Sequence, residues 1–257
     1  MERDPSIEQL LRALSARGYD VCGVASARHH DVEVPPAHRL ASDGTPDRLV
    51  VVVGHSRGWW HRCLEELEMQ PGLLERSDPI DAVTEHMVED AISVSDSASA
   101  FAEGRWGVRY AHHDHPPSMR RLAAQAGLAS VGPAGIGAHP RWGPWIALRA
   151  VIVTDVTAAP PPVPASPGPC IGCSAPCGPA MEEASRKYPL TADATRVPVD
   201  GWRAYAGARL ACPVGAEERY DPLQLEYHYT HAREVLRAAI TQRGKCSTKK
   251  SKTRSSM

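Results

Sequence analysis

Hydrophobic residues recur along the chain with the periods of helices and of buried strands. In residues 6–17, four apolar side chains share the spacing of one helix face: Ile7, Leu10, Leu11 and Leu14. Ser6 with Gln9 three positions later predicts a capping box at the helix start, and Gly18 suits the helix end. The pattern therefore predicts an amphipathic helix near the N-terminus.

Two segments have the composition of strands. Residues 49–53 form a continuous apolar run before Gly54, which predicts a strand buried on both faces. Residues 145–155, WIALRAVIVTD, are rich in β-branched side chains and predict a strand that ends at Asp155. Three helices are predicted between these strands, over residues 59–67, over residues 79–94 and over a segment that ends at Gly127.

The second half of the chain changes in character. Residues 158–169 hold six prolines and predict an extended connector. A cysteine-bearing segment follows, and then a helical stretch of about 19 residues ends near Ile240. We expect residues 1–157 to form the N-terminal and central part of an α+β domain, with the connector, cysteine segment and C-terminal helix of residues 158–240 packing on it. Residues 241–257 are basic and polar and predict a disordered tail.

The composition favours a small-molecule ligand. With 257 residues the chain can bury a core without disulfide or metal support. Its 29 Lys and Arg nearly balance its 30 Asp and Glu, which gives no reason to expect nucleic acid or an anionic membrane as the main partner. No apolar run reaches the about 18 residues of a membrane span, and the acidic start is unlike a secretory signal, so a cytoplasmic location is expected.

Four of the seven cysteines have the spacing of a metal centre. Cys170, Cys173 and Cys177 follow the pattern C-x2-C-x3-C, and Cys212 comes 35 residues later in a Cys-Pro pair. Four thiolates are the ligand set of a tetrahedral zinc ion or of a [4Fe–4S] cluster, and the second is preferred here. The glycines and prolines around the first three suit a cluster loop better than a packed helix. This use of cysteine is typical of a reducing compartment.

Three histidines and an aspartate lie together in residues 109–115, RYAHHDH, and by residue type would suffice for a metal site. However, neighbouring residues point apart on any regular element, and Pro116 and Pro117 follow directly. We therefore expect these histidines to lie in a loop, where one of them could still contact a ligand phosphate or amide.

A second candidate site mixes flat aromatic surface with fixed positive charge: Arg141, Trp142, Trp145 and Arg149. Such a segment suits a large, flat, partly anionic ligand. The alternative is that the tryptophans complete the core under a strand. The motifs GxGxxG, GxxxxGK(S/T), GxSxG and HExxH do not occur in the sequence, which disfavours the common dinucleotide, P-loop, hydrolase and zinc-protease sites.

Three stretches, SDPIDAVTEHM, AHPRWGPWIALRAVIV and ERYDPLQLEYHY, resemble the cblC-type vitamin B12-processing proteins, and the similarity runs from about Arg48 to Ile240. The stretch MRRLAAQAGLASVGPAGIGAHPRWGPWIALRAVIVTD is equally similar to epoxyqueuosine reductase and related cobalamin-dependent iron–sulfur reductases. Members of both families share a nitroreductase-like, cobalamin-binding α+β fold. The resemblance implies a central, mainly antiparallel sheet flanked by helices, with a small cysteine-bearing insertion towards the C-terminus.

The resemblance also implies a cobalamin site. The residues that match the motif lining the corrin side are His139, Pro140, Trp142, Gly143, Trp145 and Arg149. In the cblC-type proteins the arginine matching Arg149, with one near Arg209, helps to hold glutathione as a co-substrate. The implied chemistry is thiolate attack on the upper cobalt ligand, in dealkylation or decyanation, or electron transfer from a cluster to cobalt.

Departures from both families shape the expected function. The cblC-type proteins have no comparable cysteine loop, whereas the reductases carry two clusters and a lysine where this chain has Pro133. We expect a cobalamin-binding oxidoreductase or trafficking protein with one [4Fe–4S] cluster on the four cysteines. An electron-donor protein and a homodimer are compatible with the resemblance. The alternatives are a non-catalytic cobalamin chaperone with a structural zinc, and a flavin-binding nitroreductase-like enzyme.

Overall fold

The computed structural model describes residues 4–41, 47–95, 97–157, 168–190 and 197–254, with side chains as far as Gly244. Most of the proline-rich connector predicted over residues 158–169 lies outside the described residues. No described helix combines the length and the apolar composition that crossing a membrane requires.

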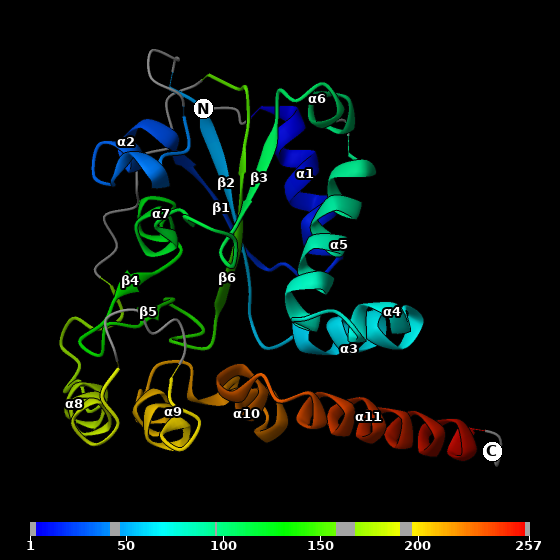
Figure 1. Ribbon diagram of the computed structural model, residues 1–257, viewed down its shortest axis with the longest axis vertical. Helices are drawn as coiled ribbons and strands as arrows, with labels where there is room; N and C mark the ends of the chain where they lie inside the picture. Colours follow the sequence, from blue (N-terminus) through cyan, green and yellow to red (C-terminus); the bar gives the residue numbers. More distant parts are fainter. Residues whose placement is uncertain (1–3, 42–46, 96, 158–167, 191–196, 255–257) are drawn as a thin grey trace.

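A four-stranded antiparallel sheet forms the centre of the fold (Figure 1). In the order β1-β2-β6-β3, its strands are Val21–Ser26, Leu49–His55, Ala147–Val153 and Gly107–Tyr110. The pairing of β2 with β6 shifts register between Val53 and Gly54, which lets the end of β2 turn towards the next helix. A separate two-stranded sheet pairs β4, Ser130–Val131, with β5, Gly137–Ala138.

Both faces of the central strand β2 are buried, as its apolar run predicts. Val51 and Val53 pack into one cluster with side chains of the helices α1 (Pro5–Ala16), α3 (Trp59–Met69) and α5 (Pro79–Ser93). Val50 and Val52 pack on the opposite side, with side chains of α2 (Ala27–Asp31) and α7 (Met119–Gln125). The sheet therefore lies between two helical layers (Figure 1).

The last four helices lie in a row across one end of the sheet (Figure 1). In chain order α8 to α11 are Cys177–Lys187, Trp202–Leu210, Pro222–Thr230 and Arg233–Arg254. Tyr227 and Leu236 belong to the same buried cluster as α1, α3 and α5, so this row shares the main core. The shorter elements are α4 (Pro71–Leu74), α6 (Ala98–Ala102) and the 3-10 turns η1 (Pro36–His38) and η2 (Ala216–Glu218).

The structure confirms the predicted α+β fold with a mainly antiparallel sheet flanked by helices. The helices predicted over residues 6–17, 59–67 and 79–94 correspond to α1, α3 and α5. Gly127 has a φ of 69°, the left-handed conformation expected at the end of α7. The strands β1 and β3 were not predicted, because both are short edge strands that include half-buried or exposed positions.

Two details of the predicted elements are wrong. The N-cap of α1 is Asp4 rather than Ser6, since the Asp4 carboxylate accepts a hydrogen bond of 2.9 Å from the Ser6 backbone N–H. The C-terminal stretch of about 19 residues is divided into α10 and α11, because His231 adopts a left-handed conformation with a φ of 50°.

The helix α11 continues to Arg254 and so overlaps the range in which the sequence predicts a disordered tail, residues 241–257. Arg243 gives a physical reason for the longer helix. Its guanidinium forms ion pairs with Glu65, at 2.6 Å, and with Glu68, both on α3. These contacts tie α11 to the body of the protein beyond Ile240.

Candidate functional site

The four cysteines of the predicted metal centre converge from two segments. Cys170 and Cys173 lie in the turns before α8, Cys177 opens that helix, and Cys212 follows α9. Cys170, Cys177 and Cys212 line one pocket, called the cysteine pocket below. Burial raises the pKa of Cys212, and the neighbouring Cys177, Cys170 and Cys173 raise it further.

The backbone around the first three cysteines is folded into tight turns. Gly172 and Ala175 have positive φ angles of 76° and 52°, and the Ala175 N–H donates a hydrogen bond of 3.3 Å to the Cys173 sulfur. Such a donor stabilises a thiolate that binds a metal. The expectation of a loop without helix is wrong at Cys177, which begins α8 and so lies at the positive end of a helix.

The spread of the sulfur atoms bears on which metal they fit. Within the described residues, no three cysteines have sulfur atoms that all lie within 4.8 Å of one another. A tetrahedral zinc ion with Zn–S bonds of about 2.3 Å holds its sulfurs about 3.8 Å apart, whereas an iron–sulfur cube holds four thiolates around a larger core. Four cysteine thiolates are a possible ligand set for either centre.

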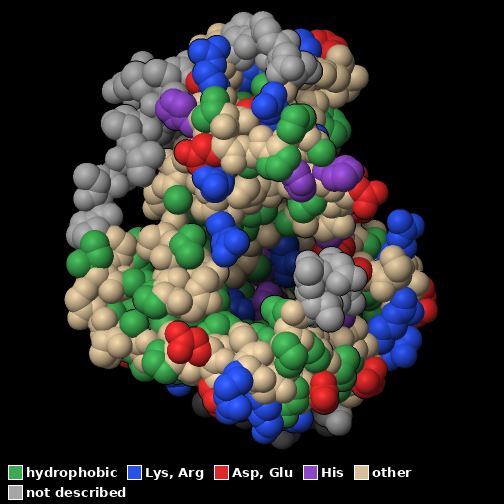
Figure 2. Space-filling view, turned by 60° about the vertical axis from the view of Figure 1, so that its left-hand side comes forward, with side chains coloured by type: hydrophobic (Ala, Val, Ile, Leu, Met, Phe, Trp, Pro, Cys, Tyr) green, Lys and Arg blue, Asp and Glu red, His purple; other side chains and the backbone are tan. Residues whose placement is uncertain are grey.

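A second pocket, called the aromatic pocket below, lies between the end of β2, the start of α3 and the segment of α10, and encloses about 360 Å³, part of it open to solvent. Its aromatic walls are Trp59, Trp60, Tyr220 and Tyr227. Its positively charged or titratable residues are Arg149, His55, His228 and His231. The space-filling view shows a hollow in the molecular surface with basic and histidine side chains deep inside it (Figure 2).

Arg149 is the predicted site residue that lines the aromatic pocket. It extends from β6, and its Nε donates a hydrogen bond of 3.1 Å to Nε2 of His55. Its guanidinium carbon lies 5.7 Å from the centre of the Trp59 ring, and its Nη1 lies 3.9 Å from a carboxylate oxygen of Asp81. These three contacts fix a positive charge at the pocket.

Two imidazoles that line the aromatic pocket with Arg149, the buried His55 and the half-buried His228, favour the neutral form. Burial lowers the pKa of His55 well below its usual value, and the positive charge of Arg149 lowers it further. Nδ1 of His55 lies 2.9 Å from the Ser56 carbonyl oxygen, so the neutral ring donates there and accepts from Arg149 at Nε2. Burial likewise lowers the pKa of His228. The pocket therefore combines one fixed cation with uncharged hydrogen-bonding rings.

One layer of side chains, called the shared wall below, separates the two pockets. Arg209 lines the cysteine pocket, and Tyr220 lines the aromatic pocket. The Arg209 guanidinium carbon lies 4.7 Å from the Tyr220 ring centre and 5.0 Å from that of Trp145. Its Nε donates to the Pro144 carbonyl at 2.9 Å and its Nη2 to the Ile146 carbonyl at 3.2 Å. Arg209 is buried, and its donors hold backbone rather than facing an open site.

The outer part of the predicted cobalamin motif lies apart from the aromatic pocket. Nδ1 of His139 accepts hydrogen bonds from the N–H groups of Arg141 and Trp142, and burial lowers the pKa of His139 to about 4. The Trp142 ring packs on His139 with a centre-to-centre distance of 4.2 Å, and Pro140 is exposed. The predicted site residues His139, Pro140 and Trp142 do not line the aromatic pocket, so the structure does not bring them beside Arg149.

The inner part of the motif is structural. Trp145 is fully buried among side chains of α9 and α10, as the alternative of a core tryptophan expects. Gly143 has a φ of 54°, and a Cβ there would overlap the Val214 carbonyl group. Gly215, with a φ of 65°, approaches the Trp142 backbone in the same way. These glycines join the tryptophan loop to the segment that follows Cys212.

Sequence reasoning did not select the residues that α10 and its flanks contribute to the aromatic pocket. They are Tyr220, Gln224, Tyr227, His228 and His231. Gln224, Tyr227 and His228 lie within α10 at spacings of three or four positions, and this polar and aromatic stripe was the available signal. Tyr220 and His231 flank the helix.

The sequence matches no protein-family model and no curated protein. Similarity is found among solved structures. The B12-trafficking protein CblC of C. elegans is similar with a TM-score of 0.53 and 15% identity, over 90% of this chain and 96% of that protein. Epoxyqueuosine reductase from Bacillus subtilis has a TM-score of 0.46 and 14% identity, over 84% of this chain and 66% of the reductase. A catabolic reductive dehalogenase has a TM-score of 0.42 and 13% identity, over 91% of this chain and 35% of the enzyme.

The chain has the nitroreductase-like α+β fold that its sequence predicts. More particularly, it has the fold of the C. elegans B12-trafficking protein over nearly the whole length of both chains. At 15% identity this likeness concerns the fold, and the function is argued below from the two pockets.

Proposed function

We propose that this protein binds cobalamin at the aromatic pocket, holds one [4Fe–4S] cluster on the four predicted cysteines, and acts in reductive cobalamin processing. The observation that carries the proposal is the shared wall, in which Arg209 packs between Trp145 and Tyr220. Groups bound on either side of one side-chain layer would be close enough to exchange electrons directly. The fold of a B12-trafficking protein gives independent support.

The aromatic pocket suits a flat macrocycle that carries amide groups and a phosphate. Trp59 and Tyr227 line the pocket with aromatic rings, the residue type that packs on a flat macrocycle. The neutral imidazole of His228 can donate to or accept from an amide. Arg149 offers a fixed cation to the phosphate, or to a carboxylate of a thiol co-substrate such as glutathione. His55 contributes by holding Arg149 in place.

The cysteine pocket suits a cluster in its donor type and its surroundings. When bound, a cluster supplies single electrons and a corrinoid supplies a metal that can accept them. The chain's own part is to hold and shield this centre. Cys177 and Cys212 are buried, which limits contact with water, and the Ala175 N–H donates to the Cys173 sulfur. A zinc ion in this pocket would instead support the chaperone alternative.

Metal analysis of anaerobically purified protein, with an absorption spectrum of the same sample, tests the cluster. We expect about four iron atoms per chain and a broad absorption near about 400 nm from thiolate-to-iron charge transfer. Cys173→Ser should remove both. Cys22→Ser is the matched control, because Cys22 lies outside the set and contacts the Tyr19 carbonyl at 3.5 Å. One zinc per chain, or full iron content in Cys173→Ser, contradicts the cluster assignment.

Titration of the same sample with cobalamin tests the second part of the proposal. We expect the cobalamin spectrum to shift to the form without its lower nitrogen ligand, because that form accepts electrons more readily. The shift should persist in Cys173→Ser, whose aromatic pocket is unchanged. A cobalamin spectrum that stays unchanged with the wild-type protein would reject cobalamin as the ligand, whatever the iron content.

A further inference from the structure

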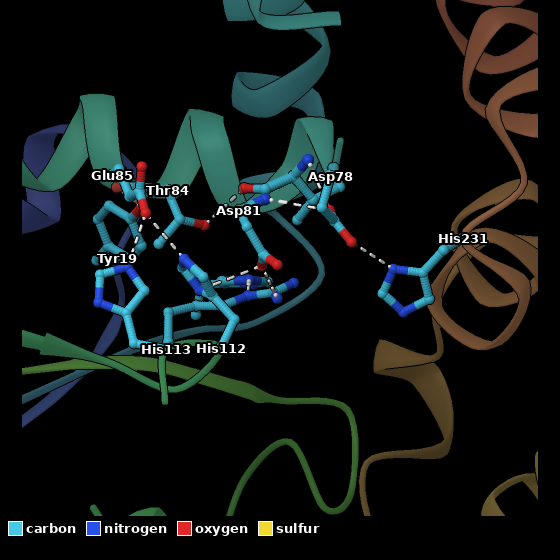
Figure 3. Close-up of polar contacts among 11 residues, drawn as sticks. Tyr19, Asp78, Asp81, Thr84, Glu85, His112, His113 and His231 are labelled. Atoms are coloured by element: carbon cyan, nitrogen blue, oxygen red, sulfur yellow. Dashed lines mark hydrogen bonds and ion pairs between the residues drawn. The ribbon is translucent and has the colours of Figure 1, made fainter. Parts of the chain in front are cut away.

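Two histidines and a glutamate meet on the far side of Asp81 from Arg149. Figure 3 shows Glu85 on α5 facing His112 and His113 in the turn that follows β3. Nε2 of His112 and Nε2 of His113 each lie 3.0 Å from the same carboxylate oxygen of Glu85. Within the described part of the chain, this is the one group of three metal-ligating side chains whose ligand atoms all lie within 4.8 Å of one another.

The fold holds the two imidazoles in place. The Tyr110 ring is buried at the end of β3, and its centre lies 5.4 Å from that of His112 and 5.0 Å from that of His113. The two imidazole planes are almost perpendicular, at 86°. Adjacent residues point apart on a strand or helix, but here they lie in a turn, so both rings reach one point. Glu85 closes that point from another element.

A second carboxylate orients one of the rings. Nδ1 of His112 lies 3.4 Å from Asp81, on the side of the ring opposite Glu85. A neutral His112 that carries its proton on Nδ1 towards Asp81 directs the lone pair of Nε2 at the Glu85 oxygen. Two acceptors facing each other at 3.0 Å need a cation or a proton between them. The arrangement of carboxylate, histidine and ligand position is the one that surrounds histidine-bound metals.

We propose that Glu85, His112 and His113 form a binding site for a divalent transition metal ion, with Zn²⁺ as the best-matched ion. Two imidazole nitrogens and one carboxylate oxygen are a zinc ligand set that leaves the fourth position to water. Bonds of about 2.1 Å in tetrahedral geometry place ligand atoms about 3.4 Å apart, close to the 3.0 Å observed. Side-chain exposures of 22% for His112, 49% for His113 and 33% for Glu85 leave the site open to an ion from solution.

The position of the site gives it a route to the aromatic pocket. Asp81 lies between His112, at 3.4 Å, and the Arg149 guanidinium, at 3.9 Å. A metal ion bound to His112 would make its Nδ1 proton a stronger hydrogen-bond donor to Asp81. Asp81 also lies near the guanidinium of Arg149, the cation of the aromatic pocket. The proposed metal site shares no residue with the cysteine pocket, so it does not depend on the proposed cluster.

The test is a Zn²⁺ titration of tag-free protein, followed by calorimetry, with three variants. Wild-type protein should bind one Zn²⁺ that the double variant His112→Ala/His113→Ala does not bind. Glu85→Gln should weaken that binding by at least about 10-fold, and Asp81→Asn by about 10-fold through loss of the ring orientation. The matched control is His86→Ala, because His86 forms a single histidine–carboxylate pair with Glu66 at 3.1 Å outside the cluster.

A cysteine variant separates this site from the proposed centre. Cys170→Ser/Cys173→Ser should lose any metal of the cysteine pocket and keep the Zn²⁺ that depends on His112 and His113. Circular dichroism of each variant confirms that the fold is retained. Equal Zn²⁺ binding by the wild type and the double histidine variant would overturn the proposal. Loss of binding in His86→Ala would overturn it as well, since the ion would then not be specific to this cluster.

Discussion

Gly143 packs its backbone directly against Val214, two positions after the proposed metal ligand Cys212. A Cβ at Gly143 would overlap the Val214 carbonyl group, and the φ of 54° there disfavours any other residue. We therefore expect Gly143→Ala to lower the free energy of unfolding by at least about 2 kcal/mol. Urea denaturation measures this change. Gly72→Ala is the control, because a Cβ at Gly72 would meet no atom within 4 Å.

The same substitution should also affect the cysteine pocket. The contact fixes the segment after Cys212, so Gly143→Ala should retain less iron after anaerobic purification than Gly72→Ala. Two variants with equal stability and equal iron content would show that the backbone contact is not important for either property.

Arg149 should be important for ligand affinity. Its side chain is held by His55, Trp59 and Asp81 and lines the aromatic pocket. We expect Arg149→Ala to weaken cobalamin binding by at least about 10-fold, because a fixed cation is lost from a partly buried site. Absorbance titration measures the affinity. Arg237→Ala, which removes an exposed arginine 3.7 Å from Glu75, should leave it unchanged; equal affinities in both variants would argue against Arg149 as a ligand contact.

Arg209 should be important for the stability of the fold. Its guanidinium is buried and holds the carbonyl groups of Pro144 and Ile146, so Arg209→Ala leaves both acceptors without these donors. We expect a loss of about 2–4 kcal/mol of stability, measured by urea denaturation, together with loss of the metal centre. Arg203→Ala is the control on the same helix, since Arg203 is exposed. Full stability in Arg209→Ala would mean that the shared wall tolerates its removal.

Acid should destabilise the protein partly through His55. Burial lowers the pKa of His55 in the folded state, whereas the unfolded chain has the ordinary value of about 6.5. Below about pH 6.5 the unfolded state therefore takes up a proton that the folded state does not, and stability falls by up to about 1.4 kcal/mol per pH unit until the folded pKa is reached.

The variant His55→Gln should flatten the dependence of unfolding free energy on pH between about pH 7.5 and 5.5, because it removes this proton uptake. Urea denaturation at several pH values measures the slope. His61→Gln, at an exposed position, should keep the wild-type slope. A slope that is the same in all three proteins would show that His55 is not the group responsible.

The elements with a strong local pattern could be predicted from the sequence. The strand β2 was predicted because burial on both faces gives a continuous apolar run in the sequence. The helix α1 was predicted because burial of one face gives apolar residues at helical spacing. The edge strands β1 and β3 have a weaker hydrophobic pattern in the sequence, since their burial depends on which neighbours the fold supplies. The break at His231 was not predicted, because a left-handed residue other than glycine has little local signal.

The candidate sites also divide into features with a local sequence pattern and features that only the fold brings together. The cysteine spacing is local and led to a predicted ligand set, three members of which, Cys170, Cys177 and Cys212, line one pocket. The histidines at residues 112–113 were expected to lie in a loop, and they do lie in a turn. Their common partner Glu85 could not be predicted, because it lies far away in the sequence and only the fold brings it near. Arg149 was predicted as a site residue for its fixed positive charge. Its neighbours His55 and Asp81 were not predicted, because they come from other elements and only the fold brings them near.

The four cysteines lie just before or at the start of α8 and just after the end of α9, two helices that pack side by side, so a metal centre there would be a cross-link. Cys177 and Cys212 are 35 positions apart, with the rest of α8 and all of α9 between them. A covalent bridge across a loop of that length removes unfolded-state entropy worth about 4 kcal/mol. A metal centre bonded to both sulfurs would constrain the unfolded chain in the same way. The segment of α8 and α9 should therefore resist proteolysis when the metal is bound and open more readily when it is lost.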